Sequence, residues 1–520
     1  MESRRAGTAL SSGRRNRLAA ALVGAALTVA AVSATVAWLH GPVVQLALTG
    51  DSYQWIQHAH AAAHRPALLL ADLDTFYRPS TTWTLVGDRV LWGGFNAHGY
   101  RVSSLALHGL VALLLVGAAR RLGLGPIAAG AVGLVWATSP FTDESAFVVA
   151  YRFQPLLLGA WLVLVASWPR RDEAWTGPRL VVAVLAVVAA AAAKETWVVT
   201  PALVAALEVD RGRSIRDVAR AVAVVGVAVA AYVAAYFMAF PTSKSYYEIG
   251  PHVAAKIPSQ LAAFLYLDEP MPFALTLSWS GALAAAVCLA LAISVVRWRI
   301  PGAWVAIVVM VAPTLPTLPV PYMPQRYLAI PYAGFLLLVA LWVVGLRRRL
   351  PRWAPVIGGM GVAAVLLVTV AGCALVRADL EDYRAIAAAH SRLLDEARAA
   401  ADVVTGGDPV LVVRDDRSQP LLEILRDPRG LPKLPFTRHD DPYGLIDAAA
   451  LFEWVVADEG TRVARVHDWS RRCAGVAGQV LIHRDGGFER RGPVADLAVE
   501  ASRWQAAGRR VRVIRAVSLD

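Results

Sequence analysis

The sequence predicts a mainly α, polytopic membrane protein that ends in a small α/β domain. Of its 520 residues, 57% are hydrophobic and only 17% are charged, and the mean hydropathy is +0.49. Soluble proteins contain about 45–50% apolar and about 25% charged residues, so the additional apolar surface must face lipid. The apolar residues also form long runs separated by short arginine-rich stretches, which is typical of membrane topology signals.

A membrane-spanning helix needs about 20 apolar residues, and shorter helices fit inside a bundle. On this rule we expect about eleven transmembrane helices, at residues 18–39, 102–119, 124–138, 153–168, 179–193, 196–208, 219–240, 276–296, 301–318, 327–346 and 353–376. Lys194 and Glu195 divide the fifth from the sixth, which form either two short helices or one long kinked helix. The first run is longer than the apolar core of a signal peptide, which is about 7–15 residues, so we expect an uncleaved anchor.

The placement of arginine predicts the orientation of these helices. Five arginines precede the first helix, which places residues 1–17 in the cytoplasm. Alternation puts the other arginine-rich connections on the same side: Arg120–Arg121, Arg170–Arg171, 211–220, Arg297–Arg299 and Arg347–Arg352. We therefore expect a multi-pass protein of the plasma (inner) membrane, with a membrane domain at 18–376. An odd number of helices places the tail, 377–520, outside the cell.

Two outside segments, 40–101 and 241–275, are too long to be simple connections, and long loops of this kind are often functional. Within the second, 252–266 has the pattern of a helix lying in the membrane interface. The tail has the size of a small domain. It is predicted to contain a helix over Leu380–Val404, strands at Val410–Val413, Val463–Val466, Gln479–His483 and Val511–Val517, and further helices at 418–426 and 494–507.

Several classes of function are disfavoured by the sequence. The net charge of +12 comes from arginines between apolar runs, so we expect membrane lipids and no nucleic acid as partners. Three cysteines cannot form a disulfide framework. The sequence has no Walker loop, zinc-binding spacing or nucleophile elbow, which argues against an ATP-driven pump or a protease of the usual kinds.

Carboxylates at the outer ends of helices are candidates for chemistry, because charge near the membrane is costly. Asp51 is either an ordinary helix cap or a general base at the membrane surface. Asp72 and Asp74, later in the same loop, are alternative holders of that role. Asp143 and Glu144 lie in a short apolar connection, either as a plain solvated turn or as part of the site.

Cations are also expected on the outer side. Arg78, preceded by Tyr77 and followed by Pro79, suits phosphate because a guanidinium offers a planar set of donors, although a lone interfacial arginine also occurs without a ligand. Arg152 and Arg326 each lie at the start of a predicted helix. Lys194 and Glu195 form either a structural helix break or part of a polar cavity. Together these residues could support phosphate-ester chemistry.

The order of these motifs resembles the transmembrane and tetratricopeptide-repeat O-mannosyltransferases. The matching segments are Tyr77-Arg78-Pro79, Trp92–Arg101 with Leu107-His108, Pro140 with Glu144 and Tyr151-Arg152, Lys194-Glu195 with Pro201, and Gln325–Leu328 with Pro331 and Gly334-Phe335. The resemblance covers about residues 50–340. It implies the C-type glycosyltransferase fold and the use of polyprenyl-phosphate sugars outside the membrane. Two features depart from the family: Asp51 is followed by Ser52 where paired acids are usual, and the tail has no tetratricopeptide repeat.

The resemblance implies an inverting transfer of a mannose-like sugar from a polyprenyl-phosphate donor to a hydroxyl of a protein or glycan acceptor. Asp51, helped by Glu144, would be the general base, and Arg78, Lys194 and Arg326 would hold the phosphate. Tyr77, Arg152 and Glu195 would complete the substrate site. No sequence feature demands a metal or other cofactor, and a divalent cation that bridges Asp51 and the phosphate remains an alternative. A non-catalytic envelope scaffold and a membrane transporter or flippase also remain open.

Overall fold

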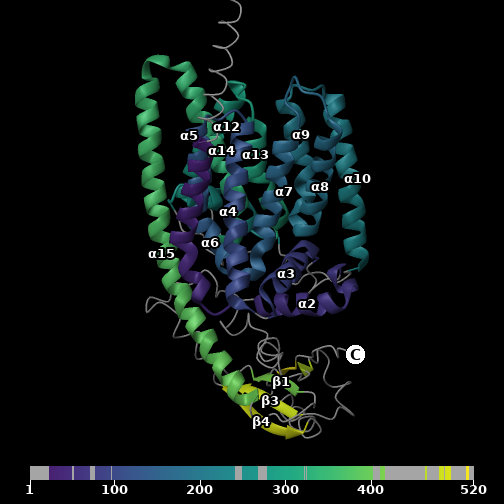
Figure 1. The fold of residues 1–520 in the computed structure, drawn as a ribbon. Helices are drawn as coiled ribbons and strands as arrows, with labels where there is room; N and C mark the ends of the chain where they lie inside the picture. Colours follow the sequence, from purple (N-terminus) through teal and green to yellow (C-terminus); the bar gives the residue numbers. More distant parts are fainter. Residues whose placement is uncertain are drawn as a thin grey trace, which may run out of the picture.

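In the computed structural model, long helices form a bundle, and a small sheet lies at the far end of the last helix (Figure 1). The structure describes residues 23–49, 52–70, 77–94, 96–239, 249–267, 278–320, 323, 325–401, 410–415, 463–464, 479–484, 487–493 and 511–513. Asp51, Asp72, Asp74 and the tail helices expected at 418–426 and 494–507 lie outside these residues.

Each of the eleven predicted segments coincides with a helix in the described part of the chain. Seven helical segments there are long and apolar enough to cross a membrane. They are Val23–Gln45, α4 (Ala97–Arg121), the segment Val149–Ser167 with η3 (Val149–Arg152) and α7 (Phe153–Ser167), α10 (Ile215–Ala239), α12 (Trp279–Arg297), α14 (Ala329–Arg349) and Pro351–Ala388, which includes η7 (Pro351–Trp353) and most of α15 (Ala354–Ala401). The prediction of a polytopic, mainly α membrane protein is confirmed.

The other predicted spans are shorter helices. They are α5 (Pro126–Ala137), α8 (Gly177–Ala193), α9 (Thr200–Asp210) and α13 (Ala303–Val311), the last continued by η5 (Ala312–Thr317). A rise of about 1.5 Å per residue makes α5 about 18 Å long, well below the bilayer core of about 30 Å. The chain covers the remaining depth by turning at Thr138 and Ser139 into the short helix α6 (Pro140–Phe147). The alternative of two helices at 179–208 is the one observed, joined by η4 (Glu195–Val199).

The helix starts follow from local sequence. Proline occupies the first turn of α3 (Pro79–Trp92), α5, α6 and α8, where a missing N–H costs nothing. A side-chain oxygen accepts a hydrogen bond from the first turn of α4 and α6, through Asn96 and Ser139 respectively. The sequence therefore sets where α6 begins, and with it the position of Asp143 and Glu144.

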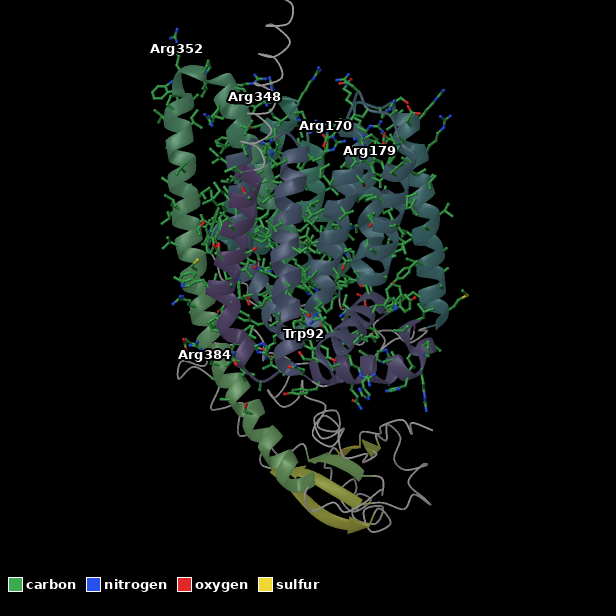
Figure 2. The ribbon with its side chains drawn as sticks, in the orientation of Figure 1. Trp92, Arg170, Arg179, Arg348, Arg352 and Arg384 are labelled. Carbon is green, nitrogen blue, oxygen red and sulfur yellow. The ribbon has the colours of Figure 1, made fainter. Side chains whose placement is uncertain are left out.

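The two ends of the bundle differ: arginines of the connections lie at one end, and short helices cover the other. Arg170, Arg179, Arg348 and Arg352 lie at one end (Figure 2). At that end Glu173 pairs with Arg121 at 2.8 Å and with Arg179 at 2.6 Å. The short helices α2 (Ser52–His64), η2 (Pro66–Leu70) and α3 lie at the opposite end (Figure 1). Arg170, Arg348 and Arg352, which the sequence analysis expected on one side of the membrane, thus lie at the same end of the bundle (Figure 2).

The helix predicted within the second long loop is α11 (His252–Phe264). It packs against α12 and is largely buried, whereas the sequence suggested a helix in the membrane interface. Hydrogen bonds of the α11 side chains explain why the helix is buried in the protein and does not lie in the membrane interface. The Gln260 side chain donates to the Met310 carbonyl at 3.1 Å and accepts from the Thr314 hydroxyl at 2.6 Å, so the polar residues of α11 face protein partners.

Helix α15 continues through the domain boundary expected at 377 and reaches the tail without interruption. The described tail strands are β1 (Val410–Asp415), β2 (Val463–Ala464), β3 (Gln479–Arg484), β4 (Gly487–Pro493) and β5 (Val511–Val513). β1 pairs in parallel with β2 and β3, while β4 pairs antiparallel with β3 and β5 antiparallel with β1. The four predicted strands are observed, and β4 was missed.

Candidate active site

Five charged residues that the sequence singled out meet at the junction of α3, α6, α8 and α14. Glu144 lies in α6, Arg78 precedes α3, Lys194 and Glu195 follow α8, and Arg326 lies in η6 (Gln325–Tyr327) just before α14. The junction arises from breaks in helices. Lys194 has an extended backbone, with φ −163° and ψ 149°, which ends α8 and turns the chain into η4.

The Glu144–Arg326 pair joins α6 to η6. The Glu144 carboxylate is fully buried and accepts two hydrogen bonds from Arg326, one from its guanidinium and one from its backbone N–H at 2.7 Å. Removing one partner of a buried pair leaves an uncompensated charge, which costs about 3–5 kcal/mol. Glu144 therefore fixes the position of Arg326.

Arg78 is held in a similar way on the neighbouring segment. Its guanidinium lies 3.3 Å from the Glu195 carboxylate and 3.9 Å from the centroid of the Phe153 ring. The side chain is only 8% exposed, so the ion pair and the ring contact replace most of its hydration.

Lys194 lies between the two arginines. Its Nζ atom is 5.2 Å from the Phe153 ring centroid, on which Arg78 also packs. It is also 4.3 Å from the Tyr327 ring centroid, and the guanidinium carbon of Arg326 lies 5.5 Å from that ring. We call Arg78, Lys194 and Arg326 the cation row, because two shared aromatic rings connect them in that order.

The charge of the cation row is not fully balanced. Among the described residues, the three cations face two carboxylates, Glu144 and Glu195, which leaves one positive charge within this part of the chain when all are ionised. Burial lowers the pKa of Lys194 well below its usual range, and the nearby Arg78 lowers it further while Glu195 opposes the change. A bound anion would stabilise the charged ammonium, so the row is suited to a phosphate or similar group.

Tyr77 borders this site through an aromatic cluster. Its ring centroid is 6.2 Å from that of Tyr232 on α10, which lies 5.2 Å from Trp197 in η4. These rings form an apolar wall beside Arg78 and Glu195. Tyr77 therefore contributes to this site by packing against Tyr232.

Arg152 lies close to the row but is held by protein groups. It is 2% exposed, pairs with Asp88 of α3, and donates to the Ser104 hydroxyl at 2.8 Å and to the Tyr100 carbonyl. Asp88 was missed by the sequence analysis, and only its place in an amphipathic helix of the first long loop could have indicated it. Arg152 joins α3 to α4 and α7 in this structure.

Asp143 points away from the row toward helix α15. Its side chain is fully buried and lies near Asp379, which accepts a hydrogen bond from the Gln325 amide at 3.3 Å. Burial raises the pKa of Asp143 well above its usual range, and the charge of Asp379 adds to the effect. Among the described residues, no group of three His, Cys, Asp or Glu side chains could hold a metal ion.

The sequence matches no protein-family model and no curated protein. Among solved structures, the chain is similar to a crystal structure of ArnT from Cupriavidus metallidurans in the apo state, with a TM-score of 0.50 and 15% identity. The likeness covers 96% of this chain and 98% of ArnT. It shows that the two chains share a fold, and in this chain that fold is a polytopic membrane bundle.

Proposed function

We propose that this protein is a membrane glycosyltransferase that moves a sugar from a polyprenyl-phosphate donor to an acceptor hydroxyl. The fold shared with ArnT supports the general class of lipid-linked-sugar transferase. The cation row carries the proposal, because Arg78, Lys194 and Arg326 gather three cationic groups in one largely enclosed place, an arrangement suited to holding a phosphate. A mannose-like sugar, and a protein or glycan acceptor, remain the specific expectations from the motif resemblance.

The proposed reaction is an inverting displacement with Asp51 as general base. The Asp51 carboxylate takes the proton of the acceptor hydroxyl, whose oxygen forms the new bond to the anomeric carbon. The bond between that carbon and the phosphate oxygen breaks, and polyprenyl phosphate leaves with the electron pair. Its second pKa is about 6, so cations can stabilise it without a general acid.

The described residues divide into two proposed roles. Arg78, Lys194 and Arg326 bind the phosphate, while Glu195 and Glu144 hold the two arginines in place. Glu144 makes both its hydrogen bonds to Arg326, which supports an orienting role over that of a second base. We assign Arg152 to holding α3, since its donors contact protein groups.

The same proposal sets the orientation in the membrane. The arginine-rich end would face the cytoplasm, and α2, α3 and the tail would lie outside the plasma (inner) membrane. Donor and acceptor would then meet on the outer face.

The test compares variants in purified protein reconstituted in lipid and supplied with labelled polyprenyl-phosphate sugars, a mannosyl donor among them. Asp51→Asn should lower kcat by about 10²–10⁴-fold, because it removes the base, and should leave the affinity for polyprenyl phosphate nearly unchanged. Arg326→Gln should weaken that affinity by roughly 10- to 100-fold, because a charged hydrogen-bond donor is lost.

Asp217→Asn is the matched control, since this carboxylate is exposed and lies at the start of α10 near the arginine-rich end. Its kinetics should equal those of the unchanged protein. Equal activity of Asp51→Asn and the unchanged protein would show that another carboxylate is the base. If the unchanged protein neither consumes nor binds any donor, the glycosyltransferase proposal is wrong, and transport or scaffolding should be tested instead.

A further inference from the structure

One face of α15 follows α6 along its whole length. Gly372 lies against the start of α6, where an added Cβ would come within 2.6 Å of the Thr138 carbonyl oxygen. Asp379 contacts Asp143 in the first turn, and Tyr383 contacts Phe147 at the last residue. Spacings of seven and four residues place these three positions on one stripe of the helix.

Asp379 links the two segments that form the Glu144–Arg326 pair. Its carboxyl group lies near that of Asp143, the chain neighbour of Glu144. It accepts a hydrogen bond from Gln325, the chain neighbour of Arg326.

Tyr383 provides a second connection, at the far end of α6. Its hydroxyl donates to the Phe147 carbonyl at 2.9 Å and accepts from the Arg101 guanidinium at 3.0 Å. It also contacts the Thr49 hydroxyl. Arg101 is fully buried and donates to the carbonyls of Leu46, Ala47 and Phe147.

We propose that Asp379 and Tyr383 are positioning residues through which α15 fixes Glu144 and Arg326 for binding the phosphate of the donor. The inference rests on the proposed function, because it concerns the same phosphate site. It extends that function because α15 also packs against β4 of the tail sheet, so this helix would connect the tail to the phosphate site.

The probe is polyprenyl phosphate alone, titrated into the full chain in lipid nanodiscs. Asp379→Ala removes the hydrogen bond from Gln325 and the contact with Asp143. It should weaken the affinity for polyprenyl phosphate by roughly tenfold, as loss of a residue that orients a binding group typically does. Asp379→Asn can still accept from Gln325 and donate to Asp143, so it should restore most of the affinity. Tyr383→Phe should weaken binding in the same direction as Asp379→Ala.

Glu381→Ala is the control. This side chain lies on the same helix but is 68% exposed and pairs with Arg384 of the next turn, so its loss should leave the affinity unchanged. Thermal melting of every variant separates weak binding from unfolding. If Asp379→Ala, still folded, binds as tightly as Glu381→Ala, the inference is overturned. The same holds if Asp379→Asn fails to restore binding.

The outcome separates this inference from the proposed function. An unchanged protein that binds polyprenyl phosphate but transfers no sugar would disprove the enzyme, while the ranking of the Asp379 variants would still decide the positioning role. An unchanged protein that does not bind polyprenyl phosphate would disprove both.

Discussion

At the scale of single residues, the cation row depends on rings as much as on charges. Phe153 lies between Arg78 and Lys194, and Tyr327 lies between Lys194 and Arg326. Ring faces attract cations by about 0.5–2 kcal/mol each. This attraction helps three cations to gather in a largely enclosed place before any anion arrives.

Lys194 gives the row a dependence on pH. Burial and Arg78 lower its pKa, so the amine is charged below that value and becomes neutral as the pH rises through it. The affinity for polyprenyl phosphate should therefore fall as the pH rises through this lowered pKa, at a pH well below that at which an ordinary lysine loses its proton. In Lys194→Arg the fall should be absent or move to higher pH, because a guanidinium keeps its proton.

The measurement is a titration of polyprenyl phosphate at a series of pH values for both proteins. Arg348→Lys, at the opposite end of the bundle, serves as a control for surface charge and should follow the unchanged protein. Identical pH profiles for Lys194→Arg and the unchanged protein would show that Lys194 does not bind the phosphate.

At this scale the sequence identified residues but not their partners. It selected Glu144, Arg326, Arg78 and Glu195 because charge near a membrane is costly. Glu144 and Arg326 are 182 positions apart, and no local pattern joins them. Asp379 lies between the helices predicted at 353–376 and Leu380–Val404 and was not singled out, so its closeness to Asp143 could not be expected.

At the scale of elements, the bundle depends on close approach between helices. Gly334 of α14 faces the backbone of α13, where an added Cβ would meet the Met310 nitrogen at 2.2 Å and the Val309 carbonyl carbon at 2.6 Å. Backbone atoms cannot move aside as a flexible side chain does. The position of α14, and therefore of Arg326 just before it, depends on this glycine.

Gly334→Ala should consequently destabilise the protein by about 1–3 kcal/mol through overpacking. Gly117→Ala on α4 is the matched control, because nothing lies within 4 Å of its added Cβ. Alanine favours helix there, so its melting temperature should be equal or higher. Thermal unfolding in detergent compares the two. Equal melting temperatures would show that α13 and α14 are not packed as described.

Elements were predicted well where the physical constraint is local. Lipid requires apolar helices with internally bonded backbones, and arginine marks their ends, so the positions of all eleven helices could be found. Strand β4 was missed because Gly487–Pro493 has little apolar alternation. The preceding Asp485-Gly486 is a hairpin signal that would have identified it.

At the scale of the whole molecule, the two ends of the bundle face different surroundings. The tail and Arg384 lie toward one end, and Arg170 lies at the other (Figure 2). The arginine pattern predicts that the end with Arg170 is cytoplasmic. This assignment is what places the proposed transfer outside the cell.

Cysteine labelling tests the orientation. In a chain whose three native cysteines are replaced, Arg384→Cys should react with a membrane-impermeant maleimide added to spheroplasts. Arg170→Cys should react only after the membrane is permeabilised. Both side chains are exposed, so the difference reports on the side of the membrane. The reverse labelling would invert the topology and contradict an outward-facing site.

Helix α15 has a geometric consequence for the tail. Its 48 residues extend about 72 Å at 1.5 Å each, more than twice the bilayer core of about 30 Å. A single inserted residue between the site and the sheet would rotate the sheet by about 100° around the helix axis, and seven would nearly restore its heading. The length of this helix therefore sets the direction in which the tail sheet faces, and each insertion or deletion in the helix changes that direction.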